Sequence, residues 1–303
     1  MHAAHGIAGG VKPDLDLHLL EQFVTLARTQ NFTRAATELN ISQPALSRAI
    51  QRLEEQLGQP LFERKPREVA LTDFGQLFLE RAKEILRLVE ETFSELTDAS
   101  GRGRVRLGAI PTIAPYLLPS LLSSFSRNYP QVSVVVQEDT TDNLTKRCSH
   151  GEIDLAIVAL PLVAKYLEVE PLFEEELLLV LAADHPLAAA NQLAMADLDG
   201  YPFILLNEAH CLSDHIASFC QRQSLQPVTI ERTSQLVTVQ ELVALHHGIS
   251  LIPAMARKLD LSDRRVYRSI HGEKPLRTVA MMWNPYRFQS QAMKALMEHL
   301  RRN

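Results

Sequence analysis

Three cysteines have the most distinctive side-chain chemistry in this sequence. They are Cys148, Cys211 and Cys220, in a chain of 303 residues. An odd, small number of cysteines late in the chain does not form the disulfide framework of a small secreted domain. In a reducing compartment, a pair of cysteines serves redox chemistry or metal binding, or is simply buried. The cysteines alone leave these three uses open.

A second group of chemically distinct residues lies between positions 33 and 67. Their spacing is typical of a helix-turn-helix, in which the second helix enters the major groove with its N-terminal residues at the base edges. Gln43 can pair there with adenine, and Arg48 can reach guanine or a phosphate. The expected DNA-binding residues are Thr33, Arg34, Ser42, Gln43, Pro44, Ala45, Ser47, Arg48, Arg52, Arg64, Lys65 and Arg67.

Apolar residues at steps of three and four predict the helices that position this group. We expect helices over 14–30, from Asn31 to Leu39, and from Ser42 to Leu57, with Ser42 as N-cap and Gly58 ending the third. Residues 59–71 have the composition of a hairpin, whose basic turn at 64–67 would be a wing tip suited to phosphates or the minor groove.

A long helix is expected next, capped by Thr72 and running to about Asp98. A coiled-coil-like seam is predicted along it, formed by Phe74, Phe78, Ala82, Ile85, Val89, Phe93 and Leu96. Ser100–Gly103 would be a flexible joint.

From Val105 onward, short β-rich runs alternate with helical ones. Such a βαβ series predicts a largely parallel sheet. The expected fold is therefore an α/β domain preceded by an all-α winged helix-turn-helix domain and a long linker helix.

Composition limits the classes of protein that fit. The net charge is −5, so a DNA-binding surface must be a local patch. We find no apolar run of about 18 residues or more, which predicts no membrane span. Residues 1–13 do not resemble a secretory signal and are expected to be a disordered lead-in, which favours a cytoplasmic location.

The segment from Phe32 to Arg64 resembles the signature of the LysR-type transcriptional regulators. It follows the pattern F-x-x-A-A-x-x-L-x-x-S-Q-P-A-L-S-x-x-I-x-x-L-E-x-x-L-G-x-x-L-F-x-R. The resemblance extends over nearly the whole chain, including HPLA at 185–188 and GISLIPA at 248–254.

This resemblance implies an architecture and a set of partners. It implies a DNA-binding domain at 14–71, a dimerising linker helix at 72–99 and an effector domain at 104–303 that resembles periplasmic binding proteins. Lobe I would be about 104–173 plus 277–303, lobe II about 174–276, with the sensor site in the cleft between them. The implied partners are double-stranded DNA, RNA polymerase and further copies of the chain as a dimer of dimers, with no membrane. No enzyme activity, cofactor or metal is expected.

Within this family, the segment 210–220 is similar to the redox segment of the peroxide-sensing members, including the spacing of nine between Cys211 and Cys220. The segments 109–119, 155–160 and 171–173 follow the same members. This similarity implies that hydrogen peroxide is the signal, that Cys211 is the nucleophile and that Cys220 resolves its sulfenic acid as a disulfide. The redox-sensing residues would be Cys211, Cys220, His210, Thr112, Thr141 and Asp214.

Helix geometry would make this pair a switch. We expect a helix from Asp214 to Phe219, whose N-terminal dipole could lower the pKa of Cys211. Nine residues of helix span roughly 13–14 Å, whereas a disulfide needs Cα atoms about 4.4–6.8 Å apart. Oxidation would therefore require local unwinding.

The sequence departs from the peroxide-sensing members at two places. Ser213 and Asn284 stand where those members carry arginines thought to assist the thiolate. Lower reactivity or a different trigger would follow.

Other functions also fit parts of the sequence. A regulator of the same fold could respond to a small metabolite between the lobes, with Cys211 incidental. A thiol peroxidase is disfavoured by the DNA-binding half, and a transport binding protein by the missing export signal.

Overall fold

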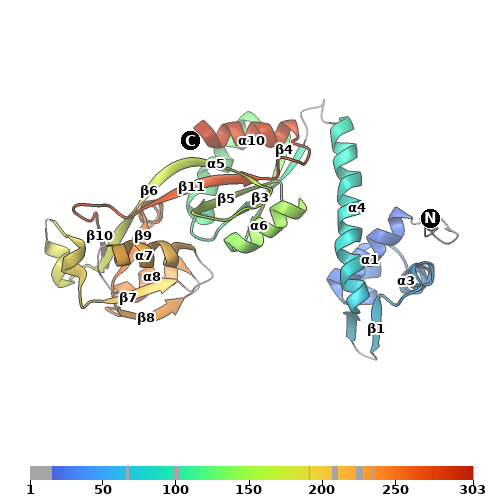
Figure 1. Cartoon of the computed structure of the whole chain (residues 1–303), viewed down its shortest axis with the longest axis horizontal. Coiled ribbons are helices and arrows are strands. Elements are labelled where there is room, and N and C mark those ends of the chain that lie inside the picture. Colours follow the sequence, from blue (N-terminus) through green and yellow to red (C-terminus); the bar gives the residue numbers. More distant parts are fainter. Residues whose placement is uncertain are drawn as a thin grey trace, which may run out of the picture. The chain divides into compact units, whose positions relative to one another are not determined.

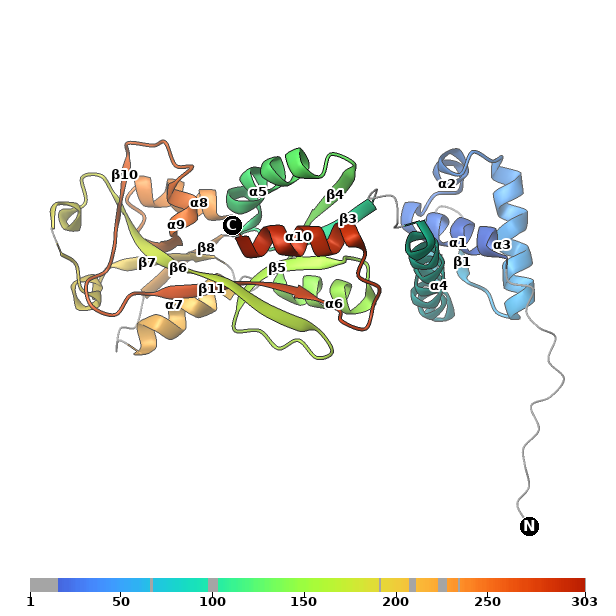
Figure 2. The same cartoon turned by 90° about the horizontal axis from the view of Figure 1, so that it is seen from above.

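The structure is a computed structural model that describes residues 16–65, 68–97, 103–190, 192–206, 211–222, 228–233 and 235–302. The chain divides into two compact units, Met1–Leu96 and Thr97–Asn303 (Figures 1 and 2). In the part of the chain that is described, no helix has both the length and the apolar character needed to cross a bilayer.

The first unit is a winged helix-turn-helix. Its elements are α1 (Leu17–Thr29), α2 (Phe32–Glu38), α3 (Gln43–Leu57), β1 (Phe62–Lys65), β2 (Glu68–Leu71) and α4 (Asp73–Thr97). The expected caps are confirmed: Asn31 accepts from the backbone N–H of Arg34 at 3.0 Å, and Ser42 from that of Ala45 at 3.3 Å. Gly58 ends α3 in the left-handed region, with a φ of 66°. Local sequence signals therefore set the boundaries of the DNA-binding helices.

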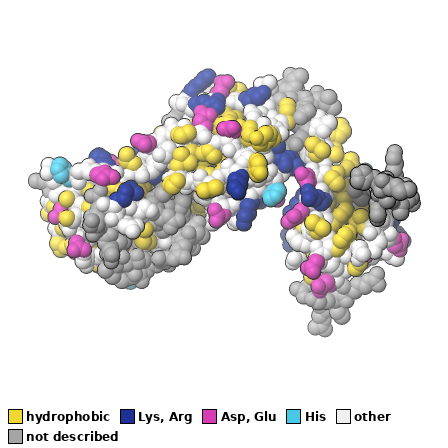
Figure 3. Space-filling model, viewed as in Figure 1, with side chains coloured by type: hydrophobic (Ala, Val, Ile, Leu, Met, Phe, Trp, Pro, Cys, Tyr) yellow, Lys and Arg dark blue, Asp and Glu magenta, His cyan; other side chains and the backbone are white. Residues whose placement is uncertain are grey.

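The seam that we expected along α4 is partly wrong. Phe74, Phe78 and Ala82 pack into the core of the first unit, against Phe23 and its neighbours. Their spacing therefore serves this core and not a second chain. The exposed apolar side chains of α4 are Leu77, Ile85, Leu88 and Phe93, of which Ile85 and Phe93 belong to the expected seam and Leu77, Ile85 and Leu88 share one face, and Figure 3 shows hydrophobic side chains gathered along this helix.

The second unit begins with a parallel arrangement. Its first elements are β3 (Gly103–Ala109), α5 (Ala114–Asn128), β4 (Val132–Glu138), α6 (Thr141–His150) and β5 (Leu155–Leu160). β3 pairs in parallel with both β4 and β5. Helix α10 (Gln291–Arg302) packs with α5 on one face of this sheet, and α6 lies on the other (Figure 1). The buried side chains of these elements form one core, which we call lobe I.

Two long antiparallel strands correct the expectation of a largely parallel sheet. β6 (Glu168–Ala182) and β11 (Leu276–Trp283) pair antiparallel, and β11 also pairs antiparallel with β5 (Figure 2). β6 continues to pair antiparallel with β9 (Ser250–Pro253) and β10 (Arg265–Arg268). The sheet is mixed because these strands run on from lobe I instead of returning after a crossover helix.

A second core, which we call lobe II, forms around the far end of β6. Its other elements are β7 (Pro202–Leu206), α7 (Cys211–Arg222), β8 (Val228–Thr233), α8 (Leu236–Ala244) and α9 (Ala254–Arg257). β7 and β8 pair in parallel, with α7 on one side of β7 and α8 on the other (Figure 2). The two lobes confirm the expected fold class, whereas their residue boundaries stay predictions.

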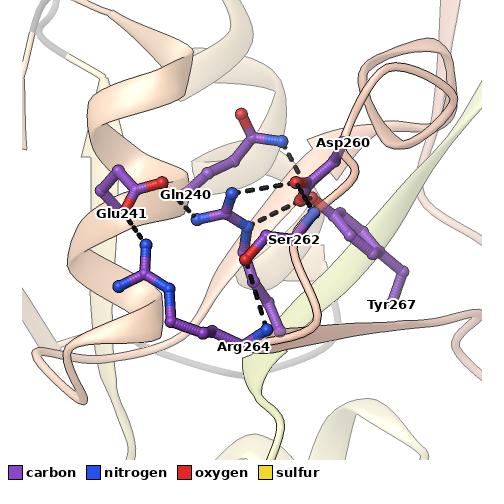
Figure 4. A network of polar contacts seen from close by, with 7 residues as sticks. Gln240, Glu241, Asp260, Ser262, Arg264 and Tyr267 are labelled. Carbon is purple, nitrogen blue, oxygen red and sulfur yellow. Dashed lines mark hydrogen bonds and ion pairs between the residues drawn. The ribbon is translucent and has the colours of Figure 1, made fainter.

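A polar network fixes α8 to β10 in lobe II (Figure 4). The buried Arg265 guanidinium donates to both oxygens of Asp260, at 2.6 and 2.9 Å, and to Glu241 at 2.9 Å. Tyr267 donates to Asp260 and accepts from Gln240. Arg265 and Tyr267 hold the pKa of the Asp260 carboxyl at about 2, despite its burial. The network is satisfied by its own members, which indicates a structural role.

Replacing Asp260 by asparagine is expected to lower the free energy of unfolding at pH 7 by about 1–3 kcal/mol, because Arg265 loses its charged partner. The folded pKa lies below the ordinary value of 3.8, so the carboxylate stabilises the protein above about pH 4 and ceases to do so as the pH falls toward 2. Denaturant titrations at pH 7 and pH 2.5 measure the free energy of unfolding at each pH. Its decrease from pH 7 to pH 2.5 should be smaller in Asp260→Asn than in the wild type. Asp263→Asn, an exposed change in the same loop, should behave like the wild type.

Candidate functional site

The residues of helix α3 that we predicted to read DNA lie largely in solvent. Gln43, Pro44, Ser47, Arg48 and Arg52 are exposed, and Ala45 is half-buried. The opposite side of α3 is anchored in the core by the buried Leu46, Ile50 and Leu53. The hydrogen-bonding end of α3 is therefore rigidly held with its polar residues in solvent.

The remaining DNA-binding predictions fall on neighbouring elements. Thr33 and Arg34 are exposed on α2, where Arg34 lies 3.6 Å from Glu38. The backbone of Arg64 and Lys65 lies in β1, and Arg67 lies outside the described residues. The wing therefore has its predicted strands.

Replacing Gln43 by alanine is expected to weaken binding to a specific operator by about 1–3 kcal/mol, because a bidentate contact to adenine would be lost. Binding to nonspecific DNA should change little, since that term comes from phosphate contacts. Fluorescence anisotropy at a fixed salt concentration measures the affinity for the operator and for nonspecific DNA. Gln51→Ala is the matched control, because Gln51 lies further along α3 and donates to Glu55 at 3.0 Å. Equal losses on both DNAs would contradict base reading by Gln43.

Helix α7 holds both cysteines of the expected redox pair. The helix begins at Cys211 itself, three residues earlier than we predicted, and continues past Cys220 to Arg222. The backbone of Asp214 lies in its first turn, and His210 lies outside the described residues. Nine helical residues separate the two cysteine Cα atoms by roughly 13–14 Å, which no disulfide spans.

The buried thiols are strongly protected. Cys220 is a free, fully buried thiol in the lobe II core, and burial raises its pKa to about 11. Cys148 is also free and buried, with its thiol directed at the carbonyl of Met282 at 3.7 Å and its pKa raised by burial to about 12. Both thiols are neutral near pH 7 in this conformation.

Thr112 and Thr141 lie at the same edge of the lobe I sheet. Each follows the last residue of a strand by three positions, and those residues, Ala109 and Glu138, are partners in the parallel register of β3 and β4. The carboxyl edge of parallel strands is where ligands bind in open α/β sheets. The Thr141 hydroxyl oxygen is buried and has no hydrogen-bond partner among the described residues. It is therefore available to a small ligand.

The hydroxyl of Thr112 has a partner that sequence analysis missed. Arg277, which is fully buried, donates to Thr112 Oγ1 at 3.0 Å and to the Thr112 carbonyl at 3.1 Å. Its guanidinium also pairs with Glu175 at 2.8 Å. The available signal was Arg277, the one charged residue of β11, but its pairing with Glu175, one of five glutamates in β6, spans 102 positions of sequence and is visible only in the fold.

Asn284, one of the two departures from the expected pattern, has a structural role here. Its side-chain amide donates to the carbonyl of Ser149 at 3.0 Å and accepts from the backbone N–H of Tyr286 at 3.0 Å. It ties the end of β11 to the end of α6 and supplies no positive charge. The other departure, Ser213, lies in the first turn of α7.

Comparison with known proteins decides the family. Residues 17–76 match the family described as "Bacterial regulatory helix-turn-helix protein, lysR family", and residues 98–303 match the "LysR substrate binding domain". The chain belongs to the LysR family of bacterial transcription regulators. LysR-family membership makes it a DNA-binding regulator and places it outside the enzyme families.

Several relatives within the LysR family carry a more specific name. The chain is 34% identical over 275 residues to the "Hydrogen peroxide-inducible genes activator" of Dickeya chrysanthemi, covering 89% of this chain and 90% of that protein. Full-length OxyR from Pseudomonas aeruginosa has a similar structure, with a TM-score of 0.75 and 31% identity over 95% of both chains. An H2O2-bound OxyR mutant from Corynebacterium glutamicum has a TM-score of 0.65 and 33% identity, covering 96% and 92% of the two chains.

Proposed function

We propose that this LysR-family regulator senses hydrogen peroxide through Cys211 and Cys220. The observation that carries the proposal is that both cysteines lie on one helix, Cys211 at its first residue and Cys220 in its last turns. A disulfide between them is incompatible with that helix, so oxidation must change the structure of lobe II. The names of the peroxide-inducible activators and the H2O2-bound OxyR structure support the same signal.

The chemistry has two balanced steps. The Cys211 thiol first releases its proton to solvent; the thiolate then attacks one oxygen of hydrogen peroxide, the O–O bond breaks, and the second oxygen leaves as hydroxide, which takes up that proton and becomes water. The product at Cys211 is a sulfenic acid. The Cys220 thiol then forms the S–S bond, and the sulfenic oxygen leaves with two protons as water.

Position on the helix gives the two thiols different roles. Cys211 lies at the N-terminus of α7, where the helix dipole favours a thiolate. Cys220 is buried with a raised pKa and reacts only once α7 loosens. The thiol at the N-terminus is therefore the sensor, and the buried thiol delays disulfide formation until lobe II rearranges.

Thr112 and Thr141 are proposed to hold the peroxide. Both lie at the carboxyl edge of the lobe I sheet, and the Thr141 hydroxyl is unpaired among the described residues. His210, which directly precedes α7, and Asp214 in its first turn would complete the site from lobe II.

DNA recognition is proposed to involve several copies of the chain. The exposed apolar face of α4, formed by Leu77, Ile85 and Leu88, would pair with the same face of a second copy. A two-fold dimer would place half-sites one turn, about 34 Å, apart or at multiples of that distance. Two such dimers would assemble as a dimer of dimers on the DNA, and this assembly would act on RNA polymerase.

Footprinting of a target promoter by the reduced and the peroxide-treated protein tests this function. The wild type should give two different footprints, and Cys211→Ser only the reduced one. Cys148→Ser is the matched control and should respond as the wild type does, because Cys148 lies in lobe I, away from α7. A Cys211→Ser protein that keeps its response would refute thiol sensing and favour a metabolite bound between the lobes.

A further inference from the structure

The guanidinium of Arg277 links β11 to β6, to the turn before α5 and to α9. It lies on β11 directly opposite Glu175 on β6, and the Arg277 side chain is fully excluded from solvent. It donates to the hydroxyl and the carbonyl of Thr112. Glu175 also accepts from the backbone N–H of Met255 in α9, and Arg277 contacts the sulfur of Met255, whose side chain packs in the lobe I core, at 3.7 Å. The position of Thr112 is thus fixed by a buried ion pair.

The charge of Arg277 also fixes the direction of the hydrogen bond. A guanidinium only donates, so the Thr112 oxygen must accept through a lone pair. Among the described residues, the Thr112 hydroxyl has no acceptor for its own proton. A hydroxyl that accepts from a cation becomes a stronger donor, because hydrogen bonds in a chain polarise one another. Thr112 is thereby prepared to donate to a small ligand.

We propose that Arg277 is a positioning residue for peroxide reduction, acting through Thr112. This inference rests on the proposed function. As the Cys211 sulfur bonds to one peroxide oxygen and the O–O bond breaks, negative charge develops on the oxygen that leaves as hydroxide. Thr112, held and polarised by Arg277, donates to that oxygen and stabilises the charge. The hydroxide then takes up a proton from solvent, equal to the one that the Cys211 thiol released when it ionised, and leaves as water.

Two reactions of the same thiol separate this role from a structural one. Oxidation of Cys211 by hydrogen peroxide needs stabilisation of a leaving oxygen, whereas alkylation by iodoacetamide releases iodide and does not need Thr112. Both rates should be measured on the full-length protein by mass spectrometry. The variants are Thr112→Val, Thr112→Ser, and the neutral pair Glu175→Gln with Arg277→Gln, which keeps hydrogen-bonding groups at both positions.

Thr112→Val and the neutral pair should each slow peroxide oxidation by about tenfold or more, with alkylation unchanged. Combining them should slow it no further than Thr112→Val alone, because Arg277 acts through that hydroxyl. Thr112→Ser should be oxidised at about the wild-type rate, because serine keeps the hydroxyl. If the neutral pair does not fold, Arg277→Lys replaces it: a lysine keeps the charge but lacks the fork that reaches both Glu175 and Thr112.

Three results would overturn the inference. The neutral pair could oxidise at the wild-type rate while Thr112→Val is slow, in which case Thr112 acts without Arg277. Both reactions could slow together, which would make Arg277 a structural residue only. A wild-type Cys211 that is alkylated but never oxidised by peroxide would refute the proposed function itself, and the role of Arg277 with it.

Discussion

The backbone amides of α7 should exchange with solvent orders of magnitude faster in the peroxide-oxidised protein than in the reduced protein. In the reduced protein, Cys211 and Cys220 belong to one continuous helix. A disulfide requires their Cα atoms to approach from roughly 13–14 Å to within about 6.8 Å. The amides between them therefore lose their helical hydrogen bonds. Hydrogen exchange followed by mass spectrometry of peptides covering 211–222 measures this change.

Unwinding α7 also disturbs the lobe II core. Leu212, Ile216 and Phe219 are at most 3% exposed in the helix. Exposing each side chain costs about 1.5–3 kcal/mol, so a loss of all three contacts would cost about 6 kcal/mol. Because about 1.4 kcal/mol corresponds to 30 mV for a two-electron couple, the disulfide potential would rise by about 130 mV. The oxidised form should accordingly be easily reduced again, as a reversible sensor requires.

Cys220→Ser is the control for this prediction. Its Cys211 can still become a sulfenic acid but has no partner on the helix, so the exchange of α7 should stay close to that of the reduced wild type. If α7 stays equally protected in the wild type with the disulfide formed, the helix is not the element that switches.

The buried thiols should react with iodoacetamide at pH 8 at least about a hundredfold more slowly in the native protein than in the denatured chain. With a pKa of about 11, Cys220 is a thiolate in only about one molecule in a thousand at pH 8, and Cys148, with a pKa of about 12, in fewer still. The rates should rise about tenfold for each pH unit between 8 and 10, because the thiolate fraction does.

Labelling each cysteine in native protein and in guanidinium, followed by peptide mapping, measures this difference. The denatured chain serves as the control, because burial no longer raises either pKa there. Native labelling of Cys220 at the denatured rate would show that α7 already opens without oxidation, which contradicts a buried resolving thiol.

Local features of the fold could be predicted from the sequence because their causes are local. Asn31 and Ser42 cap helices through hydrogen bonds that span three residues, and Gly58 ends α3 because it adopts a positive φ. The exposed reading face of α3 follows from the same periodicity that buries Leu46, Ile50 and Leu53. Such features need no knowledge of the remaining chain.

Features that depend on long-range pairing were predicted poorly. The apolar runs in β6 and β11 do not reveal that these strands pair antiparallel. The repeat of Phe74, Phe78 and Ala82 fits both a coiled-coil seam and an internal core, and only the packing shows that it serves the core. Arg277 and Thr112 are 165 positions apart, so their contact has no local trace in the sequence.

Intact mass and a free-thiol count on the reduced protein show whether hydrogen peroxide joins Cys211 to Cys220. Both are measured before and after about one equivalent of hydrogen peroxide, with Cys211→Ser alongside. We expect the loss of two thiols and of about two mass units, one hydrogen for each thiol that enters the disulfide. Peptide mapping should assign the bond to Cys211 and Cys220, and Cys211→Ser should not form it. Survival of all three thiols in a modest excess of peroxide would contradict the claim, leaving a LysR-family regulator with another signal.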